Sequence, residues 1–308
     1  MDKIIFLEPV LKTKIWGGKR IEKLYNYPIS SDKTGEAWLI SGHKEGSNII
    51  KNGQYKGKTL KWLFNNRKDY FNDIDVKDFP LLVKIIDAND DLSVQVHPND
   101  EGAKKYGDLG KTECWYILDA MFNTKIVYGH NAKTKEEFKR LIDADKYEEL
   151  LKYKVINKGD FLFVPAGKVH ALTKGMLVLE IQQSSDVTFR IFDYYRKDEK
   201  GNYRPLHILE SVEATFIPDK KISNKSLVKF IDENKISELI KSKYFNVEKW
   251  EIKEKYYREI DTFILCFVLN GKGMINGTNI RRGDSFIITS FTKEITILGN
   301  IEVIISYL

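Results

Sequence analysis

Cysteine is scarce in this chain of 308 residues, and the two that occur, Cys114 and Cys266, lie far apart in the sequence. Two isolated thiols form neither a thiolate metal motif nor a disulfide framework. No apolar run reaches the ~18 residues that a membrane-spanning helix needs. The first residues, MDKIIFLEPV, are too few and too charged for a secretory signal. We therefore expect a protein of the reduced cytoplasm with no membrane partner.

A block of like charge is also missing. The net charge is +6, from 50 basic and 44 acidic residues, and the lysines are scattered among acidic neighbours. Without a basic segment interleaved with aromatic side chains, we expect no nucleic-acid partner. The mild basic excess has an ordinary explanation in a solvated lysine-rich surface, and it also suits a phosphorylated small molecule.

Short strand-like runs dominate the first two thirds of the chain. They are rich in β-branched and aromatic residues and are bounded by glycine, aspartate, asparagine or proline. Eight such runs cover residues 3–9, 36–42, 80–87, 92–98, 113–120, 124–129, 160–166 and 176–183. Many short strands with turn signals between them predict a β-sandwich or β-barrel.

Three helices are expected between the strands. Residues 133–151 contain Thr134 and, three positions later, Glu137, which together form a capping box. Apolar residues then recur at helical spacing. Residues 57–66 and 205–216 also have a helical pattern. The predicted class is therefore mainly β with helical insertions.

The chain divides into two β blocks. We expect a catalytic block at 1–217, a polar lysine-rich connector with some helix at 218–243, and a C-terminal β block at 244–308. Lys158–Phe163 and Arg282–Ile287 both place a basic residue and a Gly-Asp turn before an apolar strand. Tandem related barrels or chance would each explain this likeness. All five histidines precede residue 218, so a metal site belongs to the first block.

Two strands carry polar side chains on one face. In residues 92–98, Ser93, Gln95 and His97 share a face because side chains alternate along a strand. That face is either solvated or directed as a ligand pair into a barrel. Lys111 and Glu113 share a face by the same rule. A glutamate that opens a strongly apolar strand must be exposed, ion-paired or bound to a metal.

The strongest local pattern is Gly159-x5-Pro165-x-Gly167-x2-His170. Gly159 turns the chain into a strand and Pro165 ends that strand. Gly167 then permits a tight turn that brings His170 back towards the interior. This pattern resembles the second motif of the cupin superfamily. The first cupin motif is usually His-x-His followed by Glu, whereas this chain has Gln95-x-His97 and, later, Glu113.

That variant resembles the type I mannose-6-phosphate isomerases, in their short bacterial form. The resemblance extends over essentially the whole chain and is carried by Trp16-Gly17, Gly35–Ser41, 82–100, Lys111–Glu113 and Gln182–Arg190. It implies a cupin jelly-roll β-barrel and a second, smaller cupin-like β domain without metal. It also implies one Zn²⁺ per chain, with four ligands: Gln95, His97, Glu113 and His170. Such a nitrogen and oxygen set suits zinc, and iron, manganese or cobalt could also bind.

The activity implied by the resemblance is the interconversion of D-mannose 6-phosphate and D-fructose 6-phosphate through an enediol. Arg190 takes the position of the family's active-site arginine, where a permanent cation would stabilise negative charge rather than act as a base. A purely structural ion pair of Arg190 with Asp186 or Asp193 is the alternative. The proton carrier stays open among Glu36, Lys111, Lys84 and zinc-bound water.

Several further residues are assigned to the substrate. A hydroxyl and ammonium groups can hold a phosphate, and we assign this role to Ser93 and Lys84, with Lys111 beside them. Trp16 and Asp186 complete the predicted substrate site. The remaining histidines match no ligand motif, so we expect them to be surface or hydrogen-bonded residues: His43, His130 and His207.

Two other interpretations remain. One is a non-catalytic metal-binding cupin that senses or binds a sugar, since fold alone does not establish catalysis. The other is a different cupin enzyme, such as a metal-dependent oxygenase or another sugar-phosphate isomerase. The small-molecule partner is expected to be a sugar phosphate in the main interpretation, and the protein is expected to be a monomer or a homodimer.

Overall fold

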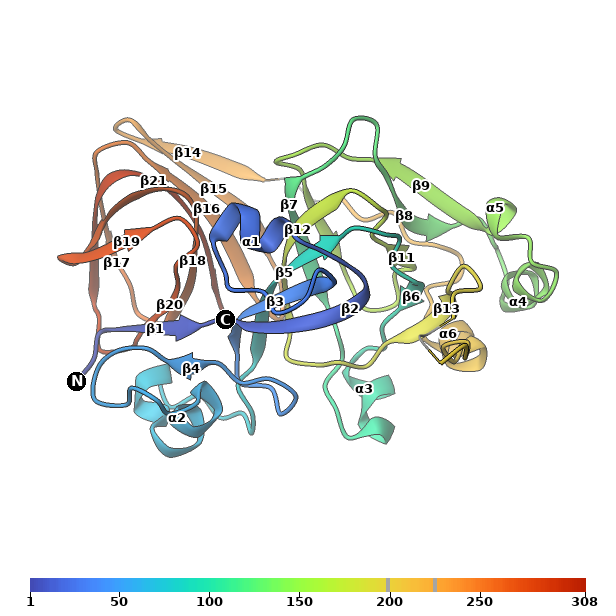
Figure 1. Cartoon of the computed structure of the whole chain (residues 1–308), viewed down its shortest axis with the longest axis horizontal. Coiled ribbons are helices and arrows are strands. Elements are labelled where there is room, and N and C mark those ends of the chain that lie inside the picture. Colours follow the sequence, from blue (N-terminus) through green and yellow to red (C-terminus); the bar gives the residue numbers. More distant parts are fainter. Residues whose placement is uncertain (198–199, 224–225) are drawn as a thin grey trace.

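A computed structural model describes residues 1–197, 200–223 and 226–308. Figure 1 shows two β lobes side by side, with helices on their outer surfaces. The predicted class, mainly β with helical insertions and a second β domain, is confirmed. No helix among the described residues has the length and apolar character needed to cross a membrane.

The first lobe is built on an antiparallel six-stranded sheet. Its strand order is β10 (Phe161–Val164), β7 (Glu113–Asp119), β12 (Met176–Gln183), β5 (Leu81–Ala88), β3 (Thr34–Ser41) and β2 (Val10–Gly18). Every residue of β3, β5 and β12 is buried. Strands covered on both faces have continuous apolar runs rather than clean alternation, which is the pattern seen in the sequence.

A second sheet of five strands faces the first. Its order is β13 (Phe189–Phe192), β6 (Val94–Val96), β11 (His170–Ala171), β8 (Lys125–His130) and β9 (Leu151–Val155). Trp115 and Ile86 from the six-stranded sheet pack with Ile126 and Leu172 from the other side. The two sheets thus form a sandwich, and polar side chains occupy the rest of its interior.

Helices cover the outer face of the five-stranded sheet. They are α4 (Lys135–Asp143), α5 (Tyr147–Leu150) and α6 (Ile208–Ala214), seen at the right of Figure 1. The capping box is confirmed in part. Thr134 Oγ1 accepts from the Glu137 N–H at 3.1 Å, but the Glu137 carboxylate accepts from the Lys133 N–H at 2.7 Å, one residue before the N-cap. The predicted helix 133–151 is divided at Asp145, whose φ is 54°.

The remaining helices are short. The helix expected at 57–66 is present as α2 (Leu60–Asn66), and α1 (Arg20–Tyr25), α3 (Asp100–Ala103) and the 3₁₀ turns η1 (Lys68–Phe71) and η2 (Lys104–Tyr106) lie in loops. Thr59 caps α2 by accepting the Trp62 N–H.

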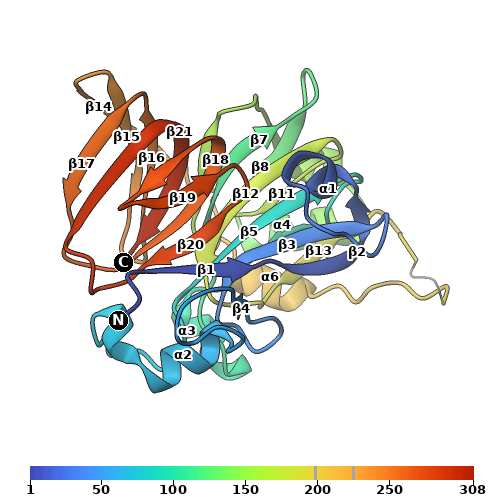
Figure 2. The same cartoon turned by 60° about the vertical axis from the view of Figure 1, so that its left-hand side comes forward.

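The second lobe is a ten-stranded antiparallel sheet that curls around its own core. Its main path is β14 (Leu227–Ile231), β15 (Asn234–Lys241), β16 (Asn246–Ile252), β21 (Glu294–Tyr307), β18 (Ile264–Ile275), β20 (Ser285–Ile288), β1 (Ile4–Glu8) and β4 (Ile49–Ile50). Strands β17 (Lys255–Glu259) and β19 (Thr278–Arg281) pair with β21 and β18. Figure 2 shows β1 entering this lobe beside β20.

One expectation about the connector is wrong. We expected some helix in residues 218–243, but its described part contains strands β14 and β15, and β15 pairs with β16 along its length. The two boundaries proposed at 217 and 243 stay a prediction.

A shared apolar core joins the lobes. Val83 and Leu179 on the back of the six-stranded sheet pack in one cluster with Phe267 and Ile304 of the second lobe. The six-stranded sheet therefore has one face in this inter-lobe core and the other directed at the polar interior of the sandwich. That second face carries the candidate site.

Candidate active site

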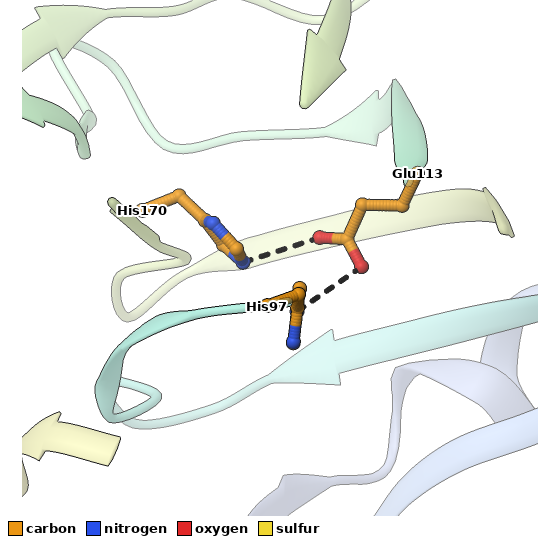
Figure 3. Close-up of side chains that lie close together, drawn as sticks. All are labelled: His97, Glu113 and His170. Carbon is orange, nitrogen blue, oxygen red and sulfur yellow. Dashed lines mark ion pairs between the residues drawn. The ribbon is translucent and has the colours of Figure 1, made fainter. Parts of the chain in front are cut away.

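Two imidazoles and a carboxylate meet in the interior of the sandwich (Figure 3). Nε2 of His97 lies 3.4 Å from Glu113 Oε2, and Nε2 of His170 lies 3.2 Å from Glu113 Oε1. The ligand atoms of the three side chains all lie within 4.8 Å of one another, and all three residues are buried. They come from the end of β6, the start of β7 and β11, so both sheets contribute to the cluster.

Backbone carbonyls orient both imidazoles. His97 Nδ1 lies 2.9 Å from the Val187 carbonyl oxygen, and His170 Nδ1 lies 2.7 Å from that of Lys168. A carbonyl only accepts, so each Nδ1 must carry the proton. Each Nε2 is then left with a lone pair directed at the cluster, as metal-ligating histidines require.

Gln95 stands beside this cluster. It pairs with His170 across β6 and β11, and its side-chain amide comes within 3.4 Å of His170 Nε2. The oxygen and nitrogen of such an amide are assigned from their surroundings, so a rotated amide would present its oxygen instead. The four predicted ligands therefore lie together, and their role as metal ligands stays a prediction.

The donor set fits a divalent metal. Neither carboxylate oxygen of Glu113 accepts a hydrogen bond among the described residues, although both are buried. Burial opposes ionisation of Glu113, but the charge of neighbouring Lys111 holds its pKa well below the usual range. Burial, reinforced by Lys111, lowers the pKa of His97 to about 3. A carboxylate and neutral imidazoles are the protonation states that a metal needs.

Lys111 touches the same cluster. Its Nζ lies 3.1 Å from Glu113 Oε2 and 3.2 Å from His97 Nε2, and the residue is 4% exposed. The predicted shared face of Lys111 and Glu113 is therefore observed. The amino group of Lys111 is therefore within reach of any group that binds the metal.

A pocket of about 270 Å³ opens beside the cluster. Eight of the predicted site residues line it: Trp16, Glu36, Lys84, Ser93, Gln95, Lys111, Asp186 and Arg190. The remaining three, His97, Glu113 and His170, are not part of its lining and lie in the buried cluster. The structure thus brings the whole predicted set into one region.

One wall of the pocket is a network of buried charges. Lys84 Nζ lies 2.8 Å from Glu180 Oε1 and 3.8 Å from Glu36 Oε1. Burial opposes both charges, but the ion pairs dominate: they lower the pKa of Glu36 to about 2 and raise that of Lys84. Trp115 and Trp38 donate their indole N–H groups to Glu180 and Glu36 at 2.7 and 2.8 Å.

Arginines form the opposite wall. Arg190 donates through one terminal nitrogen to the Pro205 carbonyl at 2.7 Å, while its Nε is buried without a hydrogen-bond acceptor among the described residues. Arg204 lines the pocket beside it and is paired with Asp193. Burial, followed by repulsion from Arg204, lowers the pKa of Arg190. No ion pair of Arg190 with an aspartate is found among the described residues.

The histidines set aside in the sequence are hydrogen-bonded, as expected. His207 Nδ1 accepts from the Arg190 N–H at 3.2 Å. His130 Nε2 lies 2.8 Å from the Phe216 carbonyl oxygen, and His43 Nδ1 accepts from the Glu45 N–H at 3.3 Å.

Sequence reasoning missed four charged or hydroxyl-bearing residues that line the pocket, namely Lys14, Glu180, Thr188 and Arg204, along with its apolar and aromatic lining other than Trp16. Glu180 had a usable signal, because a carboxylate inside the apolar run 176–183 requires a partner, just as Lys84 does in its own run. Lys14, Thr188 and Arg204 lie among other polar residues, and no spacing singles them out.

Comparisons with known proteins agree with this geometry. The model of the type I phosphomannose isomerase catalytic domain matches residues 4–150, and that of the mannose-6-phosphate isomerase cupin domain matches 235–308. A Bacillus subtilis (strain 168) protein named probable mannose-6-phosphate isomerase GmuF is 44% identical over 314 residues, covering 100% of both chains.

Solved structures share the fold. The crystal structure of the mannose 6-phosphate isomerase from Bacillus subtilis has a TM-score of 0.97 at 39% identity and covers 100% of both chains. A zinc-bound holo mannose 6-phosphate isomerase has a TM-score of 0.80 at 15% identity over 99% of both chains, a level that shows the fold alone. The predicted cupin architecture is confirmed, and the chain belongs to the type I phosphomannose isomerase family.

Proposed function

We propose that this protein interconverts D-mannose 6-phosphate and D-fructose 6-phosphate. The observation that carries the proposal is the buried cluster of His97, Glu113 and His170 beside a pocket with cationic groups on two sides. A sugar phosphate needs a place for its phosphate and a place for its reacting carbonyl, and this pocket offers both. The family membership and the names of the relatives point to the same substrate.

We further propose that the cluster holds one zinc ion, with Gln95 as the fourth ligand. Two imidazole nitrogens, a carboxylate and an amide oxygen are the donors that zinc accepts. When bound, a divalent cation supplies positive charge that stabilises the oxygen on which negative charge develops during enolisation. The protein keeps the imidazole ligands neutral and the carboxylate ligand ionised. It also holds all four side chains in a fixed orientation, away from bulk water.

Isomerisation through an enediol moves a proton from C2 to C1. By its position we assign this transfer to Lys111, whose neutral amine would take the proton from C2 and return it to C1. Glu36 is a weak base because its pKa is about 2. Lys84 retains its proton because Glu180 and Glu36 raise its pKa. Lys111 lies against the metal ligands themselves, where the reacting carbons would be held.

For the phosphate, we favour the wall formed by Arg190 and Arg204. The phosphate role predicted for Lys84 and Ser93 conflicts with the two carboxylates that contact Lys84, because they would repel a dianion. At the opposite wall, Arg190 has a buried Nε that finds no acceptor in the described part of the chain, and Arg204 lines the pocket as well. Guanidinium groups bind phosphate oxygens through parallel hydrogen bonds. Asp186 also lines the pocket, where it can accept from a sugar hydroxyl.

The test is a coupled assay that follows fructose 6-phosphate formed from mannose 6-phosphate. We expect turnover in the purified protein, loss of turnover on chelation, and recovery when zinc is added back. His170→Ala should abolish turnover because it removes a ligand. Arg190→Met should raise KM for mannose 6-phosphate at least tenfold, whereas Lys84→Met should mainly lower kcat or stability.

Each arm can contradict one part of the proposal. Zinc binding without turnover on any sugar phosphate would support the alternative of a sugar-binding cupin. Turnover that survives complete removal of metal would exclude the metal role. A larger rise in KM for Lys84→Met than for Arg190→Met would return the phosphate to the Lys84 side.

A further inference from the structure

Another largely buried ion pair, Lys168–Asp219, lies next to the turn that carries His170. Lys168, two residues before His170, is only 2% exposed. Its ammonium donates to Asp219 Oδ1 at 2.7 Å and to the Lys220 carbonyl at 2.9 Å, and it lies 4.6 Å from the centre of the Tyr128 ring. A buried lysine with this set of partners is held in one conformation.

The backbone of Lys168 is what orients the metal ligand. Its carbonyl oxygen accepts the Nδ1–H of His170 at 2.7 Å, so the direction of that carbonyl fixes the imidazole ring. Neighbouring bonds hold the same turn: the Gly167 N–H donates to the His97 carbonyl at 2.9 Å, and the Gly129 N–H donates to the Val169 carbonyl at 2.7 Å. Lys168 lies between Gly167 and Val169, and the bonds of its ammonium to Asp219 and Lys220 fix its side chain at this point of the turn.

Asp219 lies a few residues after α6, and the other end of α6 lies beside Arg190. There, just before the helix begins, the His207 N–H donates to the Arg190 carbonyl at 2.8 Å. After the helix, the chain reaches the metal turn, where the Phe216 N–H donates to the Gly167 carbonyl at 2.8 Å. Residues 205–220 thus run from the proposed phosphate end to the turn that carries His170.

A buried ion pair is weak evidence of a stabilising role, because desolvating two charges offsets most of their attraction. Its place behind a ligand-orienting carbonyl suggests another role. We propose that Lys168 and Asp219 are positioning residues that direct Nε2 of His170 at the metal. This proposal rests on the metal site proposed above. It extends the site to Asp219, whose segment lies outside both cupin motifs.

The experiment measures zinc affinity, by competition with a chromophoric chelator, in the full-length protein. Asp219→Asn removes the charge that holds Lys168 and should weaken zinc binding about 10- to 100-fold, as loss of groups that orient metal ligands does. The absorption spectrum of the cobalt-substituted protein should change as well, because the ligand geometry changes. Lys168→Arg keeps the cation and should bind zinc within a few-fold of wild type.

A matched control uses the same carboxylate. Lys152 also contacts Asp219, at 3.4 Å, but its side chain is 44% exposed and is not part of the turn. Lys152→Met should therefore leave both the zinc affinity and the cobalt spectrum unchanged. Equal losses in Lys152→Met and Asp219→Asn would indicate a general charge effect and would overturn the positioning role.

Folding and metal binding must be separated. If circular dichroism shows that Asp219→Asn is unfolded, the double variant Lys168→Met with Asp219→Leu replaces it. The double variant leaves neither partner of the ion pair buried without the other. It should fold and show the same loss of zinc affinity. Wild-type affinity in either folded variant would overturn the proposal. Failure of the wild-type protein to bind zinc would instead overturn the proposed metal site.

Discussion

At the residue scale, the pocket is defined by charges that the fold has removed from water. Lys84, Glu180 and Glu36 lie on neighbouring strands, where Glu180 is directly opposite Lys84 in the register of β12 and β5. None of them could remain charged alone at this depth. The ion pairs with Lys84 offset the cost of burying these groups, and Glu180 and Glu36 each accept one indole N–H as well.

Glu36 offers a pH-dependent test of this network. Its pKa is lowered from 4.5 to about 2, so its ionisation stabilises the folded state. That contribution is complete above pH 4.5, the value for an unfolded glutamate, and is lost as the pH falls through about 2. We expect Glu36→Gln to lower the free energy of unfolding by about 3 kcal/mol near neutral pH, and by less at pH 3.

The measurement is urea unfolding of metal-free wild type and Glu36→Gln between pH 7 and pH 3. The gap between the two proteins should narrow as the pH falls. Glu45→Gln is a suitable control, because Glu45 is exposed in the same region of the chain. A gap for Glu36→Gln that stayed constant over this range would show that the carboxylate is not held ionised by its neighbours.

The grouping of single residues was predictable where a motif fixed the spacing. His97, Glu113 and His170 were identified from two short patterns, and they form one cluster. The partners of Lys84 were not predictable, because they depend on the register between β5, β12 and β3, which a single sequence does not contain. Arg204 is distant from every motif, so only the fold reveals it.

At the element scale, the turn between β10 and β11 is the most informative feature. Gly167 has a φ of 88°, and a Cβ at this position would lie 2.9 Å from the Phe216 ring. The glycine is therefore needed for two reasons: its left-handed backbone and its contact with the segment that follows α6. We expect Gly167→Ala to displace this turn and to reduce both zinc affinity and kcat at least tenfold.

Gly159 provides the matched control for that substitution. Its φ is 90°, but a Cβ there would meet nothing within 4 Å. Gly159→Ala should therefore cost only the backbone strain, about 1 kcal/mol of stability, with zinc affinity unchanged. Calorimetry and chelator competition on both variants test the pair. Equal zinc affinities in the two variants would show that Gly167 is needed only for its backbone conformation.

The incorrect helix expectation also has an explanation at this scale. Ile236, Leu239 and Ile240 recur at helical spacing, which favours a helix in a single sequence. In the structure, β15 contains a register shift between Glu238 and Ile240 where it pairs with β16. Such an irregularity interrupts the alternation of a strand, so its apolar residues imitate helical spacing.

At the scale of the whole molecule, the two lobes stabilise each other through one apolar core. The back of the six-stranded sheet supplies Val83 and Leu179, and the second lobe supplies Phe267 and Ile304. Strand β1, at the start of the chain, pairs with β20 near its end. The two β blocks were predictable from their strand runs. The pairing of β1 with the second lobe was not, because β1 precedes the strands of the first lobe in the sequence.

These contacts argue that the second lobe supports the first. In the described residues, the group of His and Glu side chains that could hold a metal lies entirely in the first lobe. Deleting residues 244–308 would remove β16 to β21, leave β1 without β20 and expose the back of the sheet that carries Glu113 and Lys84. An apolar face of that size in water favours aggregation. We expect the truncated protein to be insoluble or to bind a hydrophobic dye strongly.

Soluble yield, dye fluorescence and isomerase activity would be compared for the truncated and full-length proteins. Phe267→Ala in the full-length chain gives a graded version of the same test, because Phe267 is 1% exposed in the shared core. It should lower the free energy of unfolding by about 3 to 5 kcal/mol and leave zinc affinity unchanged. A soluble and fully active truncation would mean that the first lobe is stable alone, and the second lobe would then need a role other than support.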